Sequence, residues 1–361
     1  MKVNWWKTTI GEEEIERVVK SIRNKNISQG PVTAEFESLI SQYLEIDHVV
    51  AFSSGSTALL VALMALGVKS GDEVIMPNRT WIATAHAVHL LGAKVVLVDV
   101  EKSRPIIDAS QIEKKITPST KVILPVHLNG RSSNMKLINK IAKKYKISVI
   151  EDAAQAFSSK NSDGFLGTQS EIGCFSLSIA KTIGTGQGGF SVTKDKDLAK
   201  RMKAIRTHGV ENVKDPQSWE MLGLNFRYTD ILASIGIEQL KRLPQRRNRL
   251  CEIYSLYLKK LNGTEFKPIE VDLKAGEVPV YNEFLINNRS EWIKKLDKLG
   301  IETRPFYPNV NEASYLYDND KEVFKNSLPY QENGIILPSG PDQDYSSVDE
   351  SIEAIKYLSQ K

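Results

Sequence analysis

The 361-residue sequence lacks the features that mark several classes of protein. It contains only two cysteines, Cys174 and Cys251, which lie far apart and have no metal-ligand spacing around them, so neither a disulfide framework nor a metal site is expected. The longest apolar run, residues 59–66, is too short to cross a bilayer, and the N-terminal stretch MKVNWWKTTIGEEEIERV has no apolar signal-peptide core. We therefore expect a cytoplasmic protein that does not associate with membranes.

An excess of charge of one sign is also missing. The 48 basic residues nearly balance the 44 acidic ones, and the basic residues are scattered apart from short clusters such as residues 246–249. Nucleic-acid binding is therefore not indicated. A chain of this length and ordinary globular composition can form one large domain and a smaller second one without disulfide or metal support.

Short apolar runs alternate with helical patterns between residues 48 and 152. The runs are HVVAFSS, DEVIMP, AKVVLVDV, KVILPVH and ISVIED. Strands that are apolar on both faces and separated by helices predict a mostly parallel sheet that is covered on both sides. Because ligands gather at the carboxyl ends of such strands, we expect residues 53–57, 77–81, 127–131 and 152–155 to share one rim.

The pattern changes after Asp152. It predicts strands around CFSLS and GFSVTKD, a helix over DKDLAKRMKAIRTHG, and a helix from about residue 228 that Pro244 interrupts. VPVYNEFLI then predicts a strand, and SEWIKKLDKLG and SSVDESIEAIKYLSQK predict helices. We predict an α/β fold with a large domain, residues 1–245 including an N-terminal arm, and a smaller α+β domain, residues 246–361.

The stretch CFSLSIAKTIGTGQGGF, residues 174–190, contains a lysine followed by a cluster of glycines. The spacing of these glycines matches the G-x-G-x-x-G pattern of dinucleotide-binding loops, but that pattern requires a helix after the glycines, and FSVT predicts a strand. A phosphate-binding loop requires glycine immediately before the lysine, where this chain has Ala180. Both interpretations are rejected.

Lys181 by itself is compatible with a solvated turn lysine. Asp152 changes this interpretation, because it ends an apolar strand where an unpaired carboxylate is costly, and a cationic partner is therefore expected. A lysine on a glycine-lined turn, a buried aspartate and a helix start at Gly55-Ser56-Thr57 together match what pyridoxal 5′-phosphate requires. These requirements are an amine for a Schiff base, a carboxylate for the ring nitrogen and an anion site for the phosphate.

The segments around these residues resemble the DegT-type sugar aminotransferases, which belong to the fold-type I, aspartate aminotransferase-like enzymes. The resemblance covers about residues 28–245, and it rests on SSGSTALLVALMALGVKSGDEVIMPNRTWIATAHAV, VILPVHLNGRSSNM, VIEDAAQAF, the lysine stretch, RTHG and NFRYTDILASIGIEQL. TRPFYP extends it beyond residue 300. Many members of the family carry LP-x-H-P near the C-terminus, whereas LPSGPDQDYSS here is similar to the perosamine-synthase branch.

The resemblance implies roles for individual residues around the cofactor. Lys181 would form the Schiff base, the internal aldimine, and Asp152 would keep the ring nitrogen protonated. Gln155 would approach the phenolic oxygen, and Trp81 would stack on the ring, although a core tryptophan is an alternative reading of Trp81. The phosphate would lie at the helix start, on the residues Gly55, Ser56, Thr57 and Ser176.

Other roles implied by the resemblance concern the substrate and a second subunit. Asn225 matches the residue that reaches the phosphate of the neighbouring subunit, which implies a homodimer with shared active sites. Arg227 follows in the same motif and would hold a carboxylate or phosphate of the substrate, or else make a structural ion pair. Arg131 and Tyr307 are expected on the rim, within reach of the substrate.

The implied reaction is transamination. L-glutamate would leave its nitrogen on the cofactor as pyridoxamine 5′-phosphate, and a keto deoxysugar on a nucleotide carrier would then accept it, as in polysaccharide or lipopolysaccharide biosynthesis. Three alternatives stay open at this stage. They are a different fold-type I reaction on an amino acid, amination of a ketone without a nucleotide, and a catalytically silent protein that keeps the cofactor fold.

Overall fold

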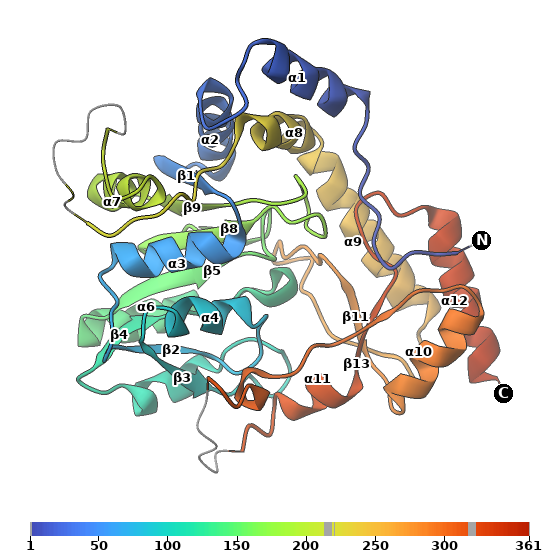
Figure 1. Cartoon of the computed structure of the whole chain (residues 1–361). Coiled ribbons are helices and arrows are strands. Elements are labelled where there is room, and N and C mark those ends of the chain that lie inside the picture. Colours follow the sequence, from blue (N-terminus) through green and yellow to red (C-terminus); the bar gives the residue numbers. More distant parts are fainter. Residues whose placement is uncertain (1, 213–218, 220, 317–322, 361) are drawn as a thin grey trace.

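The computed structural model describes residues 2–212, 219, 221–316 and 323–360, and it is built around a large sheet (Figure 1). The described residues form a seven-stranded sheet in the order β1-β9-β8-β5-β4-β2-β3. Its strands are β1 (His48–Phe52), β2 (Glu73–Pro77), β3 (Lys94–Val98), β4 (Thr120–Ile123), β5 (Ser148–Asp152), β8 (Ile172–Ser176) and β9 (Gly189–Thr193). Only β9 runs antiparallel to its neighbours among these strands. The prediction of a mostly parallel α/β sheet is confirmed.

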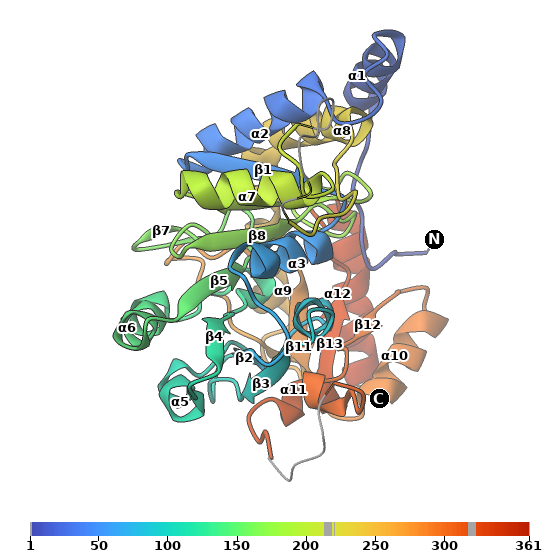
Figure 2. The same cartoon turned by 60° about the vertical axis from the view of Figure 1, so that its left-hand side comes forward.

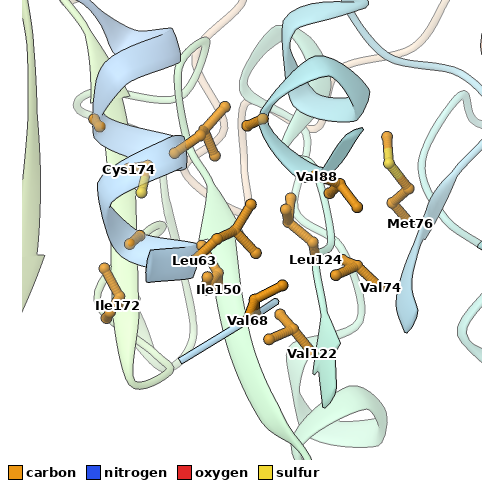
Figure 3. Close-up of a cluster of buried hydrophobic side chains, with 14 of the residues drawn as sticks. Leu63, Val68, Val74, Met76, Val88, Val122, Leu124, Ile150, Ile172 and Cys174 are labelled. Carbon is orange, nitrogen blue, oxygen red and sulfur yellow. The ribbon is translucent and has the colours of Figure 1, made fainter. Parts of the chain in front are cut away.

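Helices cover both faces of this sheet (Figure 2). The helices α3 (Gly55–Ala65), α4 (Ala83–His89) and α7 (Lys196–Arg206) pack on one face, and α5 (Ala109–Ile112) and α6 (Met135–Tyr145) on the other. The core beneath α3 and α4 joins side chains such as Leu63, Val88 and Ile150 (Figure 3). Burial on both faces explains why the central strands are apolar runs without alternation.

Three further helices lie at the β1 edge of the sheet. They are α1 (Glu12–Arg23), α2 (Pro31–Leu44) and α8 (Asp230–Lys241). The α2 and α8 helices pack together, and Gly236 permits this close approach, because a side-chain carbon there would lie 2.8 Å from the Phe36 ring. The predicted interruption at Pro244 corresponds to the start of α9 (Leu243–Lys260), where proline is tolerated in the first turn.

A second sheet of four strands occupies the C-terminal part of the chain. Its order is β10-β11-β13-β12, with β10 (Lys267–Pro268), β11 (Asn282–Leu285), β12 (Arg304–Pro305) and β13 (Gly334–Leu337). The helices around it are α9, α10 (Arg289–Lys298), α11 (Leu328–Asn333) and α12 (Tyr345–Ser359), and a short hairpin of β6 (Lys160–Asn161) and β7 (Gly164–Phe165) lies apart. The predicted strand and two helices are confirmed at β11, α10 and α12.

The N-terminal segment crosses from the first sheet to the second. Val3 forms a parallel bridge with Ile301, and Trp6 forms one with Ser339, so this segment lies along the C-terminal elements. The division into residues 1–245 and 246–361 stays a prediction, and its boundary would fall inside α9. Within the described ranges, no helix combines the length and apolarity that crossing a membrane requires.

Candidate active site

A cavity of about 530 Å³ opens at the carboxyl ends of the parallel strands. Its walls include Ser54 and Gly55 after β1, Thr80 and Trp81 after β2, and Asp152 at the end of β5. The predicted rim is therefore largely confirmed. Parts of three of the predicted segments line the cavity, and residues 127–131 lie beside it, where the backbone N–H of Asn129 donates to Gln155, without lining it. The volume lies in the range of pockets that enclose a small ligand.

Lys181 lies on this cavity wall, in the turn between β8 and β9. The strand β9 follows the glycines directly, so the rejection of a dinucleotide-binding loop is confirmed. The turn is tight, because a side-chain carbon on Gly184 would lie 2.9 Å from Cα of Ile179. The Lys181 ammonium donates a hydrogen bond of 3.1 Å to the hydroxyl of Tyr281, the residue that precedes β11 of the second sheet.

The start of α3 forms another part of the wall. Ser54 is the N-cap, and its hydroxyl accepts a hydrogen bond from the backbone of Thr57. Gly55 touches β8 so closely that a side-chain carbon would lie 2.9 Å from Cβ of Ser176. Ser56 is exposed and lines the cavity with Gly55 and Ser176, whereas Thr57 does not line it. Free backbone N–H groups and the helix dipole make such a helix start suitable for a phosphate.

Asp152 is almost fully buried, and its carboxylate contacts only neutral donors. Oδ2 accepts a 2.8 Å hydrogen bond from Thr84, and Oδ1 accepts a 3.1 Å bond from the backbone of Ala154. Burial raises the pKa of this carboxyl group, and these two bonds, with Lys181 and His127 nearby, act in the opposite direction. In the part of the chain that the structure describes, no cation forms an ion pair with Asp152. The expected cation is therefore left to a ligand.

Three further side chains complete the wall around Asp152. Trp81 is 55% exposed, so the alternative of a core tryptophan is wrong. Its ring meets the Tyr307 ring edge-on at 5.3 Å. Gln155 accepts a 2.9 Å hydrogen bond from the backbone of Asn129. Tyr307 lines the cavity as predicted, and burial raises its pKa.

The expectation for Arg131 is overturned. Its side chain is fully buried and forms a 2.6 Å ion pair with Glu283, and further N–H groups donate to the carbonyls of Glu270 and Ile269. A guanidinium held in this way has no donor directed at a substrate in the cavity. Arg131 was expected at the rim because it follows a central strand in sequence. The residues that its side chain binds instead belong to the second sheet and to the segment next to it.

Asn225 and Arg227 do not line the cavity of their own chain. Asn225 is exposed, and its side-chain oxygen accepts a 2.9 Å hydrogen bond from Nε of Arg227. Among the described residues Arg227 forms no ion pair, so the structure does not support the alternative of a structural ion pair. An exposed position outside the cavity is compatible with a role at a neighbouring subunit, which stays a prediction.

Sequence reasoning missed several residues of this wall, notably Tyr281, Thr84 and Trp5. For Thr84, a signal was available, because it follows Trp81 by three residues and so lies on the same side of a helical turn. For Tyr281 and Trp5 no local signal exists, since their contacts depend on how the second sheet and the N-terminal segment pack on the first.

Comparison with known proteins places the whole chain in one group. Residues 8–356 match the DegT/DnrJ/EryC1/StrS aminotransferase family. The chain is 38% identical over 291 residues to GDP-perosamine synthase of Caulobacter vibrioides, covering 78% of each protein. It is 35% identical over 323 residues to GDP-perosamine synthase of Escherichia coli O157:H7, covering 87% of this chain and 86% of the other.

The fold is similar to solved structures of sugar aminotransferases. One is the putative sugar aminotransferase Spr1654 from Streptococcus pneumoniae in its PLP form, with a TM-score of 0.92, 26% identity and coverage of 100% of this chain and 99% of that chain. The same protein in its PMP form gives a TM-score of 0.94. These similarities extend over the elements that form the cavity.

Proposed function

Because the chain belongs to the DegT/DnrJ/EryC1/StrS aminotransferase family, we propose that it transfers the amino group of L-glutamate to the keto group of a nucleotide-linked deoxysugar. Pyridoxal 5′-phosphate serves as its cofactor in the cavity that contains Lys181 and Asp152. The similarity to two GDP-perosamine synthases makes a GDP-linked keto sugar the first substrate to test. A cytoplasmic site of action and a homodimer with shared active sites are part of this proposal.

The observation that carries the proposal is the pairing of an amine with an uncompensated buried carboxylate on one cavity wall. Asp152 lacks an ion-pair partner among the described residues, and a protonated ring nitrogen would supply the missing cation. Lys181 supplies the amine, and the start of α3 supplies a phosphate site. The cavity residues therefore fit the cofactor in charge, donor set and volume.

Each residue would hold a different part of the cofactor. Asp152 would hold the ring nitrogen through a charge-assisted hydrogen bond, with Thr84 and Ala154 fixing the orientation of the carboxylate. Gly55, Ser56 and Ser176 would hold the phosphate, and their backbone contacts keep α3 and β8 at a fixed separation. The exposed face of Trp81 would cover the ring, and Gln155 would meet its oxygen.

Bound pyridoxal phosphate supplies a carbonyl group that captures an amine and a ring that withdraws electrons from the reacting carbon. The residues of the chain then have two tasks. Asp152 keeps the ring nitrogen protonated, so that the ring can accept electrons. Nζ of Lys181 would take the proton from the reacting carbon of the donor and deliver it to the carbon that receives the amino group, because Lys181 is the lysine that lines the cavity.

The test is an assay of purified protein with pyridoxal phosphate, L-glutamate and a panel of keto sugars that includes GDP-linked ones. We expect glutamate alone to change the visible absorbance of the bound cofactor, and a nucleotide-linked keto sugar to restore it with formation of an amino sugar. No absorbance change with any amino donor would favour a silent protein. A change with amino acids but with no keto sugar would favour another fold-type I reaction or a different ketone.

A further inference from the structure

Tyr281 directly precedes strand β11 of the second sheet, and its backbone is fixed by Asn129, which lies in the turn that follows β4 of the first sheet. The side chain of Asn129 accepts hydrogen bonds of 2.7 Å and 2.8 Å from the backbone N–H groups of Tyr281 and Val280, and it donates a 2.9 Å bond to the Tyr281 carbonyl. Asn129 is fully buried and has φ of +53°, a left-handed conformation that asparagine tolerates better than most residues. The Tyr281 backbone therefore has a defined position relative to the lysine turn.

The Tyr281 hydroxyl is oriented by the same turn that carries Lys181. It donates a 2.9 Å hydrogen bond to the carbonyl of Ala180, which occupies its only proton. The oxygen lone pairs remain to accept from Nζ of Lys181 at 3.1 Å. The hydroxyl therefore presents an acceptor to the lysine, which suits an ammonium group, because an ammonium group can only donate.

The N-terminal segment also contacts Tyr281 and the lysine turn. The Trp6 indole donates a 2.9 Å hydrogen bond to the carbonyl of Ile179, and the rings of Trp5 and Trp6 lie 6.3 Å and 5.6 Å from the Tyr281 ring. Two segments far apart in sequence, at Trp6 and at Tyr281, thus contact residues 179–181, and Asn129 fixes the second of them. This convergence restricts the movement of the phenol and of the turn.

We propose that Tyr281 is a positioning residue that holds the ammonium form of Lys181 whenever this side chain is not attached to the cofactor. The inference rests on the proposed function, in which Lys181 is the amine that binds pyridoxal phosphate. The hydrogen bond favours the protonated lysine, whereas attachment to the cofactor requires the neutral amine. Tyr281 therefore controls how readily Lys181 is released to attach to the cofactor, in the presence of the other ionisable groups of the cavity wall, Asp152, Arg304 and Tyr307.

The experiment measures attachment of the cofactor without measuring turnover. Protein freed of cofactor is mixed with pyridoxal phosphate at a series of pH values, the reaction is stopped with borohydride at intervals, and peptide mapping quantifies the cofactor on Lys181. In Tyr281→Phe we expect the pH profile of the attachment rate to move to lower pH by about one unit, the size expected for one hydrogen bond to a charged group.

The matched control is Tyr257→Phe. Tyr257 is a fully buried phenol whose hydroxyl donates to the carbonyl of Pro338, away from the lysine, so its profile should equal that of the wild type. Tyr281→Leu, which also lacks the acceptor, is measured in parallel in case Tyr281→Phe does not fold, and folding is verified by thermal unfolding. A wild-type profile in either folded Tyr281 variant would overturn the inference. Labelling of a different lysine in the wild type would instead refute the proposed function.

Discussion

The Thr84 hydroxyl donates a 2.8 Å hydrogen bond to the carboxylate of Asp152. This carboxylate forms no ion pair with any cation among the described residues. A buried carboxylate with neutral donors only is costly for a protein without its ligand. Two consequences can be measured on the same variant, Asp152→Asn. The amide keeps an acceptor for the backbone of Ala154 and removes the charge.

The first consequence concerns stability in the absence of cofactor. Because burial raises the pKa of Asp152 above its ordinary value of 3.8, the folded wild type binds this proton more tightly than the unfolded chain does. The wild type therefore loses stability as the pH rises from the ordinary aspartate pKa of 3.8 toward the raised pKa of folded Asp152. Asp152→Asn, which has no such carboxyl group, does not. We expect cofactor-free Asp152→Asn to melt at a higher temperature than the wild type at neutral pH, with the difference vanishing below the ordinary aspartate range. Asp163→Asn, at an exposed position, should show no such trend.

The second consequence concerns catalysis. Without the carboxylate the ring nitrogen loses its charge-assisted hydrogen bond, worth about 1.5–3 kcal/mol, so turnover should fall by about one to two orders of magnitude or more. The dissociation constant of the cofactor should rise less than turnover falls. Stopped-flow absorbance of the glutamate half-reaction and equilibrium titration with pyridoxal phosphate separate the two effects. Equal losses in affinity and turnover would contradict the role given to Asp152.

Lys181→Ala should abolish transamination. The change removes both the amine that attaches to the cofactor and a general base worth about 10²–10⁴ in rate, while Asp152, Trp81 and the α3 phosphate site remain. The variant should therefore still retain pyridoxal phosphate in equilibrium dialysis, although borohydride should no longer link it covalently. Wild-type turnover in this variant would refute the assignment of Lys181.

Asn225 offers a test of shared active sites. It is exposed and lies outside the cavity of its own chain, as expected of a residue that serves a neighbouring subunit. Lys181→Ala and Asn225→Ala proteins, each impaired alone, should partly recover activity when mixed, since one of the two sites in a mixed dimer then carries neither change. Mass spectrometry of differently tagged subunits verifies exchange. If exchange occurs and activity does not return, the sites are not shared through Asn225.

Arg131→Met should affect stability more than substrate binding. Removing one partner of the buried ion pair with Glu283 leaves an uncompensated charge and typically costs about 3–5 kcal/mol. Denaturant unfolding should show this loss, and the double variant Arg131→Met/Glu283→Met should recover part of it. The KM for the keto sugar should stay close to the wild-type value in the folded fraction. A selective rise in KM without loss of stability would return Arg131 to the substrate site.

Local sequence was sufficient to predict what depends on local patterns. Apolar runs predicted the parallel strands, and the strand after Gly189 excluded dinucleotide binding. The same reasoning failed where a side chain turns toward a distant segment. Arg131 follows a central strand, yet it points toward Glu283, and Tyr281 reaches the lysine turn only through its contacts with Asn129. Pairings of this kind depend on how the two sheets pack, which no local pattern specifies.

The strand order also has a consequence for the synthesis of the chain. β1 pairs with β9, so the strand near residue 50 is completed only when the strand near residue 190 has been made. The residues that line the cavity extend from Trp5 to Ile336. Contacts of such high sequence separation form slowly, and domains emerge from the ribosome in order from the N-terminus. A nascent chain thus cannot offer a complete cofactor site until most of its length has been translated. Retention of pyridoxal phosphate is therefore a measure of finished folding, and truncated or arrested chains should not retain it.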